Sequence, residues 1–345
     1  MAHVEIFDGY DMGSFRQSEL IGSTVLHLDS TFQVFSWSSD RYGLGLAGVG
    51  FTYGGPNGTL LTGGIVQSVT LACPEGRITV TGASALGATV GSAYTLNDTR
   101  ISEAALLDGD DDIHVVDGTP PTSTPNADHT YLVYGYAGND LIVGGGASST
   151  IYGGTGADTV QAASAAAGYL RGDEGDDSIR GGAGFDDING NMGDDTCVSG
   201  GGNDWVVGGK DNDSLVGSAG ANLVYGNLGN DTCEGGDGAD VVRGGQDNDL
   251  VSGGAGNDFV SGDRGNDTVT GGLGADLFHG SQDAGIDRIT DFSLAQGDRI
   301  LLDAGTTYSL FQSGADTVLD MGGSNQMILV GVSMSTLTAG AIFFG

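Results

Sequence analysis

The amino-acid sequence predicts an all-β protein, and three observations support this prediction. Glycine accounts for 66 of the 345 residues, far above the average share of about 7%. Residues 135–279 divide into nine-residue units, which are too short for a pair of helices but fit a tight turn followed by a short strand. The flanking segments, 1–118 and 280–345, alternate apolar and polar residues between glycines, as half-buried strands do.

The nine-residue repeat keeps its phase over a long stretch of the chain. From Gly172 to His279 the sequence divides into 12 consecutive units, and three more units lie upstream, starting at Gly135. The sixth position is aspartate in 13 of these 15 units, with Ser149 and Asn222 as the exceptions. The eighth position is always apolar, so we expect it to point into a core while its two neighbours point to solvent.

The charge of the chain favours cations as ligands. With 45 acidic and 11 basic residues, the formal net charge is −34, which argues against binding to nucleic acid or to anionic lipid. Coiling the repeats at a strand spacing of about 4.8 Å would stack the aspartates on one another. Stacked carboxylates repel unless a divalent cation bridges them, and Ca²⁺ prefers carboxylate and carbonyl oxygens. The repeats therefore predict a series of calcium sites.

The repeat resembles the G-G-x-G-x-D-x-U-x nonapeptides of the RTX (repeats-in-toxin, hemolysin-type) family. This resemblance implies a right-handed parallel β-roll, in which two units form one 18-residue coil and several Ca²⁺ ions lie between successive turns. The implied ligands are turn carbonyls and the sixth-position carboxylates. Sites are expected to be weak or absent at Ser149, at Asn222 and in the degenerate unit 162–171. The predicted metal-binding residues are Asp140, Asp158, Asp177, Asp186, Asp195, Asp204, Asp213, Asp231, Asp240, Asp249, Asp258, Asp267 and Asp276.

The repeats predict four regions along the chain. Residues 1–118 form an N-terminal β-rich domain, and residues 119–134 form a proline-containing linker or loop. The β-roll spans residues 135–279. Residues 280–345 form a C-terminal β cap, because the sequence after His279 resembles the D-x-I-x-D-F segment that closes RTX rolls and an open roll end needs a cap.

One outer face of the predicted roll is apolar. Alternate units lie on opposite sides, and the seventh positions of one side are Asp187 followed by five apolar residues, Trp205, Leu223, Val241, Phe259 and Leu277. We call these five residues the apolar stripe. A stripe of this length is rarely left in water. Two explanations stay open: another part of the chain covers it, or it is an interface for a second copy or another partner surface.

No known catalytic motif supports an enzyme. The sequence contains no HExxH, no GxSxG and no GxxxxGK[ST], so we predict that the protein is not an enzyme and has no catalytic residues. No apolar stretch is long enough to span a bilayer, and the first residues lack the features of a secretory signal peptide. The family resemblance implies export by type I secretion machinery, with an uncleaved signal within 280–345, from a Gram-negative bacterium.

These observations favour a secreted calcium-binding structural protein, located outside the cell or at its surface. It would fold on binding Ca²⁺ and self-assemble through the apolar stripe into a filament, an extracellular (biofilm) matrix or a surface layer. Two alternatives stay open: a monomeric adhesin or carbohydrate-binding module that binds through the N-terminal domain, and a hydrolase of unrecognised type. The sequence leaves open the geometry of assembly, the number of occupied sites and the ligand of the N-terminal domain.

Overall fold

Two compact units make up this computed structural model, Met1–Ala166 and Ala167–Gly345. The structure describes residues 130–345 except 146–147, 163–166 and 283, and in the first 129 residues it describes only the strands named below. Most of the predicted linker, 119–134, lies outside the described residues, and the predicted domain boundaries stay predictions.

The second unit consists of short strands and one short 3-10 helix within its described part. Its strands are β12 (Ala167–Glu174), β13 (Ser178–Arg180), β14 (Asp186–Met192), β15 (Thr196–Val198), β16 (Trp205–Lys210), β17 (Ser214–Val216), β18 (Leu223–Leu228), β19 (Thr232–Asp237), β20 (Val241–Gln246), β21 (Leu250–Ala255), β22 (Phe259–Arg264), β23 (Thr268–Leu273), β24 (Leu277–Gly280), β25 (Ile286–Ile289), β26 (Arg299–Leu302), β27 (Ser309–Ser313), β28 (Asp316–Gly322), β29 (Asn325–Leu329) and β30 (Ile342–Phe344), and the helix η2 spans Met334–Thr336.

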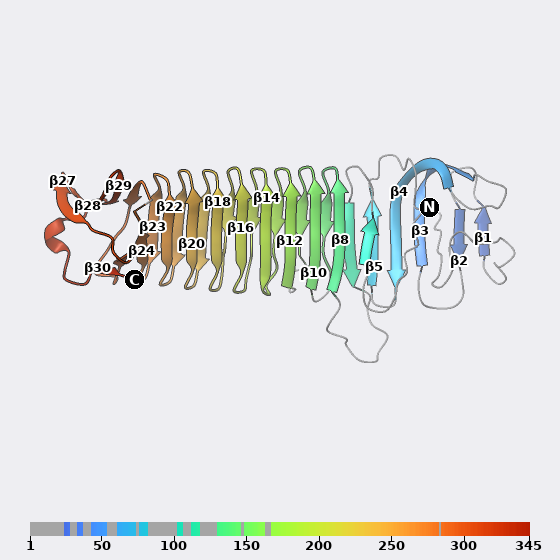
Figure 1. Cartoon of the computed structure of the whole chain (residues 1–345). Coiled ribbons are helices and arrows are strands. Elements are labelled where there is room, and N and C mark those ends of the chain that lie inside the picture. The colour runs from blue at the N-terminus through green and yellow to red at the C-terminus, as the bar shows by residue number, and fades with distance from the viewer. Residues whose placement is uncertain are drawn as a thin grey trace, which may run out of the picture. The chain divides into compact units, whose positions relative to one another are not determined.

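Consecutive strands alternate between two parallel sheets. One sheet of this unit runs β12-β14-β16-β18-β20-β22-β24-β26-β30, and the other runs β13-β15-β17-β19-β21-β23-β25 before it reaches the cap strands. The register advances by one 18-residue coil, so that Thr196 lies beside Ser214 and Trp205 beside Leu223. Figure 1 shows these strands stacked in chain order, with turns along both edges. The predicted parallel β-roll, with two repeats to a coil, is confirmed.

The core of the roll is a thin double row of eighth-position side chains. Ile179, Leu215 and Val251 are fully or almost fully buried in one sheet, as are Val206 and Val242 in the other. Their neighbours at the seventh and ninth positions are more exposed, which matches the alternation expected of strands. Each nine-residue unit thus contributes one large buried side chain, as the sequence predicts.

The turns require backbone conformations that glycine adopts easily. At the fourth position of the repeat, Gly229 has a φ of 127° and Gly238 a φ of 136°. Asp211 and Asp247 occupy the same position with φ values of 74° and 75°, in the left-handed region that aspartate tolerates better than most residues. The glycine-rich half of each repeat therefore forms the turn, and the apolar half forms the strand.

The C-terminal segment closes the roll, in agreement with the predicted β cap. β25 and β26 continue the two parallel sheets beside β23 and β24. β29 pairs in parallel with β25, and β27, β28 and β29 form an antiparallel meander at this end. β30 pairs in parallel with β26, so the last strand of the chain is also part of the sheet.

The described part of the first unit also consists mainly of strands, as predicted. They are β1 (Thr24–His27), β2 (Gln33–Ser36), β3 (Gly43–Tyr53), β4 (Leu61–Cys73), β5 (Gly76–Thr81), β6 (Ser102–Ala105), β7 (Asp112–Asp117), β8 (Thr130–Ala137), β9 (Leu141–Val143), β10 (Ser148–Thr155) and β11 (Thr159–Gln161). β3, β4, β5 and β7 pair antiparallel in succession, whereas β7, β9 and β11 pair in parallel. The change from antiparallel to parallel pairing thus occurs at β7. Within the described residues, no helix is long and apolar enough to cross a membrane.

Truncating a core residue should destabilise the roll far more than truncating an exposed one. Leu215 is fully buried between Cys197 and Cys233 of the neighbouring coils, so Leu215→Ala should lower the free energy of unfolding by about 2–5 kcal/mol. Urea titration in millimolar calcium measures this. Leu250→Ala, at a position that is 48% exposed, is the control and should cost less than about 1 kcal/mol. Equal losses for the two variants would contradict the assigned core.

Candidate metal centre

The sixth-position residues of the second unit lie in two columns of turns, one along each edge of the roll. The first turn column contains Asp177, Asp195, Asp213, Asp231, Asp249 and Asp267, and the second contains Asp186, Asp204, Asn222, Asp240, Asp258 and Asp276. In the first unit, Asp140 and Asp158 lie one coil apart in the same relation. All thirteen predicted metal-binding aspartates are buried, with exposed fractions of at most 4%. Within each unit the repeat places successive aspartates one coil apart, and their role as metal ligands stays a prediction.

Each column is held together by a ladder of hydrogen bonds between side chain and backbone. The backbone N–H of Asp213 donates to Oδ1 of Asp231 at 2.8 Å, and that of Asp231 donates to Oδ1 of Asp249 at 2.8 Å. In the second column the N–H of Asp240 donates to Oδ1 of Asp258 at 2.9 Å. One carboxylate oxygen of these aspartates therefore satisfies a buried N–H of the preceding coil, whereas Oδ2 of Asp186 accepts the N–H of Gly182 in its own turn at 2.8 Å.

The other carboxylate oxygen is buried without a hydrogen-bond partner in the described structure. This holds for Oδ1 of Asp186 and for Oδ2 of Asp195, Asp204, Asp213, Asp231, Asp240, Asp249, Asp258, Asp267 and Asp276. A buried charged oxygen that nothing satisfies is costly. A systematic row of such oxygens indicates a ligand that the protein chain itself does not supply.

At Gly226, Gly235 and Gly253 the unpartnered carboxylate oxygen and a backbone carbonyl oxygen of the next coil border the same space. A Cβ added to Gly253 would lie 2.6 Å from Oδ2 of Asp258 and 2.6 Å from the carbonyl oxygen of Gly271. Gly235 has the same surroundings, with Oδ2 of Asp240 at 2.7 Å and the oxygen of Gly253 at 2.5 Å. We call this space a turn site. It is bordered by the first-position residue of a repeat, by the sixth-position side chain of the same repeat and by a backbone carbonyl of the next coil. Two oxygens that can only accept hydrogen bonds meet there, with no N–H or O–H group between them. Carboxylate and carbonyl oxygens are the ligands that Ca²⁺ prefers.

The two repeats without a sixth-position aspartate support this interpretation. Nδ2 of Asn222 donates to the carbonyl oxygen of Gly220 at 3.3 Å and to that of Gly235 at 3.5 Å. Oγ of Ser149 donates to the carbonyl oxygen of Gly145 at 3.0 Å. Where the side chain carries a donor, a hydrogen bond to a turn carbonyl forms directly. Where the side chain is a carboxylate, it has no hydrogen to donate to a turn carbonyl. A cation would then take the place of the missing donor.

Burial raises the pKa of the ladder carboxylates in the folded chain. The pKa of Asp213 and that of Asp249 rise to about 8, first because of burial and further because neighbouring ladder aspartates repel a negative charge. The pKa of Asp195 rises to about 7 for the same kind of reason. Near neutral pH the folded roll must therefore hold protons, bury repelling charges or bind cations at these positions.

The cap extends both ladders with aspartates that the repeat pattern does not identify. The N–H of Asp267 donates to Oδ1 of Asp287 at 3.3 Å, and that of Asp276 donates to Oδ1 of Asp298 at 3.1 Å. Asp291 accepts from the N–H groups of Gly271 and Gly272 at 2.9 and 2.7 Å. The signal was present in the sequence, because Asp287 and Asp298 each precede a buried apolar residue by two positions, like every sixth-position aspartate.

A second ladder lies on the outside of the first turn column. The N–H of Asn230 donates to Oδ1 of Asn212 at 3.0 Å, and that of Asn248 donates to Oδ1 of Asn230 at 3.1 Å. The N–H of Asn266 continues the series to Asn248 at 3.0 Å. These fifth-position side chains are exposed, so their hydrogen bonds are a support for the stacked turns that does not depend on metal.

Ser261, His279 and Asp303 form a chain of polar contacts that resembles a catalytic triad in composition only. His279 Nδ1 lies 3.3 Å from Ser261 Oγ, and its Nε2 lies 3.1 Å from Oδ1 of Asp303. The Ser261 residue is 1% exposed, and its hydroxyl donates to Oδ1 of Asp263 at 2.7 Å. Asp263 in turn accepts two hydrogen bonds from the guanidinium of Arg243, each of 2.8 Å. A buried hydroxyl that donates to a carboxylate is part of a supporting network.

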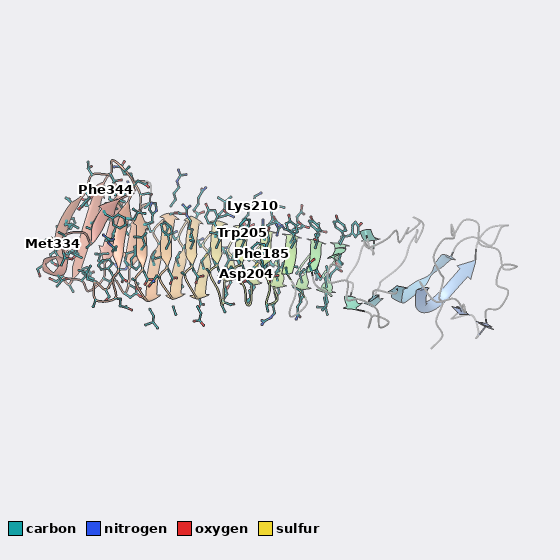
Figure 2. All side chains as sticks on the ribbon, turned by 90° about the horizontal axis from the view of Figure 1, so that it is seen from below. Phe185, Asp204, Trp205, Lys210, Met334 and Phe344 are labelled. Carbon is teal, nitrogen blue, oxygen red and sulfur yellow. The ribbon has the colours of Figure 1, made fainter. Side chains whose placement is uncertain are left out.

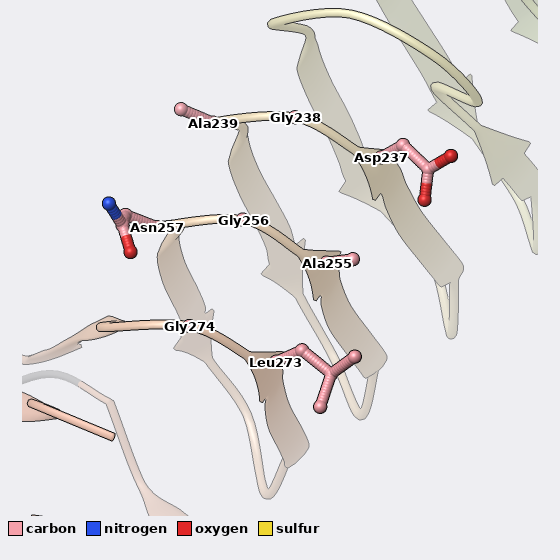
Figure 3. A pocket seen from close by; sticks show the side chains of 8 residues that line it. All are labelled: Asp237, Gly238, Ala239, Ala255, Gly256, Asn257, Leu273 and Gly274. Carbon is pink, nitrogen blue, oxygen red and sulfur yellow. The ribbon is translucent and has the colours of Figure 1, made fainter.

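An open groove of about 710 Å³ runs along the second turn column. Figure 3 shows its three successive turns, with Gly238, Gly256 and Gly274 in a row between side chains that include Asp237 and Asn257. Only one ionisable side chain lines this groove. Among the described residues, no three His, Cys, Asp or Glu side chains converge on a common point, so a metal in the turn sites would need backbone carbonyls as well.

The metal-free roll should become more stable as the pH falls. The aspartates titrate near about pH 4 in the unfolded chain, whereas the pKa values of Asp213 and Asp249 in the folded chain are raised to about 8. Folding therefore takes up protons between these values, and stability is lost as the pH rises through the window. Circular dichroism of calcium-free protein should show the strand signal growing from about pH 8 to about pH 5.

The double variant D213N/D249N should flatten this pH dependence, whereas Asp237→Asn, at an exposed position, should leave it unchanged. A strand signal of the wild-type protein that grows with rising pH would contradict the assignment.

Of the comparisons with known proteins, the match to a family model agrees with this geometry. The family model described as RTX calcium-binding nonapeptide repeat (4 copies) matches residues 134–164, 171–206, 198–233, 207–242, 234–269 and 252–289. No curated protein matches the chain significantly. Among solved structures, the extracellular lipase LipA from Serratia marcescens is similar at 19% identity and a TM-score of 0.23, over 51% of this chain. The match spans 39% of the lipase chain, and the name lipase describes that protein. The repeat region of this chain belongs to the calcium-binding RTX nonapeptide repeats.

Proposed function

We propose that this chain is a secreted calcium-binding structural protein, which folds when Ca²⁺ enters the turn sites and then self-assembles. The observation that carries the proposal is the row of buried carboxylate oxygens without partners, which at Gly226, Gly235 and Gly253 share a space with a carbonyl oxygen of the next coil. No catalytic role is part of the proposal.

The thirteen sixth-position aspartates would hold the metal together with carbonyl oxygens of the turns. Bound calcium would supply positive charge and accept several oxygen ligands at once. The Oδ1 atoms already accept N–H groups of the preceding coil, so the remaining oxygens are those that point into the turn sites. The Asp287 and Asp298 carboxylates of the cap would add ligands at the last coil.

Calcium would act as the signal that couples folding to location. A chain with a net charge of −34 and 66 glycines has little apolar surface to offset its conformational entropy and its own repulsion. At low calcium it would stay largely unfolded, a form suited to export by type I secretion machinery. In a calcium-rich medium outside the cell it would fold, and the folded form could not pass back through the secretion machinery. The typical secretion of RTX-repeat proteins supports this part of the proposal.

The apolar stripe would be the surface through which copies assemble. Its residues lie in one ladder of a parallel sheet, from Trp205 beside Leu223 to Phe259 beside Leu277. Trp205 is 53% exposed, and its ring contacts that of Phe185 at 5.7 Å between centroids (Figure 2). The opposite sheet carries mostly serine and threonine in the same ladder, which restricts the apolar contact to one face. A second copy of the chain is the partner that this self-complementary stripe would fit.

Removing calcium should unfold the roll. Full-length protein in a chelator at neutral pH should show a disordered circular dichroism spectrum, and adding millimolar calcium should restore the strand spectrum. Magnesium at the same concentration is the control for ionic strength, because Mg²⁺ binds poorly to the flexible oxygen sites that suit Ca²⁺. A strand spectrum that is unchanged in the chelator would refute calcium-dependent folding.

Replacing exposed stripe residues should weaken assembly without preventing folding. The double variant Trp205→Ser and Val241→Ser removes two side chains that are 53% and 38% exposed. Light scattering after calcium addition should show smaller particles than for the wild-type protein. Leu250→Ser, which is 48% exposed on the opposite sheet, is the matched control and should assemble normally. Assembly of the double variant at the wild-type level would exclude the stripe as the interface.

A further inference from the structure

Two neighbouring repeats of the second turn column differ from all others in the chemistry of their turn sites. Asn222 replaces the sixth-position aspartate of one repeat. Ser199 replaces the first-position glycine of the preceding repeat in the same column, one coil earlier. Both residues are buried, with exposed fractions of 3% and 0%. The first turn column has no such interruption between Asp177 and Asp267.

Asn222 keeps the ladder but changes what faces the carbonyl. Its Oδ1 accepts the N–H of Asp204 at 3.0 Å, and its own N–H donates to Oδ1 of Asp240 at 2.7 Å. Its Nδ2 lies where the second carboxylate oxygen lies in other repeats. A Cβ on Gly217 would be 2.9 Å from this nitrogen and 2.5 Å from the carbonyl oxygen of Gly235. The nitrogen donates to that carbonyl, so a donor and an acceptor meet in place of two acceptors.

Ser199 occupies the preceding turn site in a similar way. Its Oγ donates to the carbonyl oxygen of Gly217, the residue one coil on. In repeats with a first-position glycine, the corresponding carbonyl faces the free carboxylate oxygen, as that of Gly271 faces Asp258. The serine side chain fills space that is empty elsewhere. In this stretch the carbonyls of Gly217, Gly220 and Gly235 already accept hydrogen bonds from side chains.

We infer that the turn sites at Ser199 and Asn222 hold no calcium and form a metal-independent joint. The joint divides the second column into two calcium-binding blocks, while the first column is continuous. This inference rests on the proposed function, because it assigns ligands within the same array. This removes Asp204 from the thirteen proposed ligands, because the Gly217 carbonyl that would complete its site already accepts the Ser199 hydroxyl, and the site offers Ca²⁺ fewer oxygens than its neighbours do.

The joint lies beside the most exposed residue of the apolar stripe. Trp205 directly follows Asp204 in the sequence and starts β16, and Figure 2 labels both residues in this coil. Because its turn hydrogen bonds need no ion, this coil should keep local order at calcium concentrations too low to fill the rest of the second column. The environment of Trp205 then becomes a reporter of the joint.

Counting bound calcium in matched variants tests the inference. Asn222→Asp should add about one calcium ion per chain, as measured by native mass spectrometry of folded, full-length protein. It should also raise the calcium concentration needed for folding, because a carboxylate oxygen would then face the Gly235 carbonyl oxygen in place of the Asn222 amide N–H. The double variant Ser199→Gly and Asn222→Asp should add at least as many ions. Asn212→Asp adds the same charge at an exposed fifth position and should leave the number of ions unchanged.

Equal calcium counts for the wild-type protein and a folded N222D variant would overturn the inference, and so would an added ion in N212D alone. If N222D does not fold, Asp258→Asn supplies the reverse test. It should lose about one ion and fold at lower calcium, and retention of every ion by D258N would contradict the joint. A wild-type protein that folds without binding any calcium would instead refute the proposed function itself.

Discussion

The fold depends on one repeated contact, in which a buried carboxylate oxygen faces a backbone carbonyl oxygen of the next coil. Two acceptors at such close quarters repel in the absence of a proton or a cation. Asp258 and the Gly271 carbonyl show the arrangement, and the glycine between them leaves no room for a side chain. The first-position glycine, the sixth-position aspartate and the proposed calcium ion are thus all tied to this one contact.

The thin core explains why the turns matter so much. Each repeat buries one large apolar side chain, such as Leu215 or Val242, which is little apolar area for nine ordered residues. Hydrogen-bond ladders at the fifth and sixth positions connect the coils but leave one carboxylate oxygen unsatisfied in most repeats. The apolar core of the roll is therefore thin, and in the proposed function calcium bound in the turns adds the stability that this core does not supply.

Strict periodicity made the roll predictable from the sequence. The phase of the aspartates, the buried eighth position and the alternating faces all follow from a nine-residue repeat folded into two strands per coil. The cap was predicted as β structure, but its aspartates were missed because the spacing from Asp267 to Asp287 and from Asp276 to Asp298 exceeds one coil. The contacts of Asn222, Ser199 and Ser261 could not be predicted, because they depend on where a side-chain donor meets a carbonyl or carboxylate across the turn.

The most direct measurement is X-ray diffraction at a wavelength where calcium scatters anomalously, from crystals of the full chain grown in calcium. The account predicts anomalous peaks in contact with the Oδ2 atoms of Asp195, Asp213 and Asp231, inside the first turn column. A well-ordered roll that shows peaks only at exposed carboxylates such as Asp237, or none at all, would contradict it.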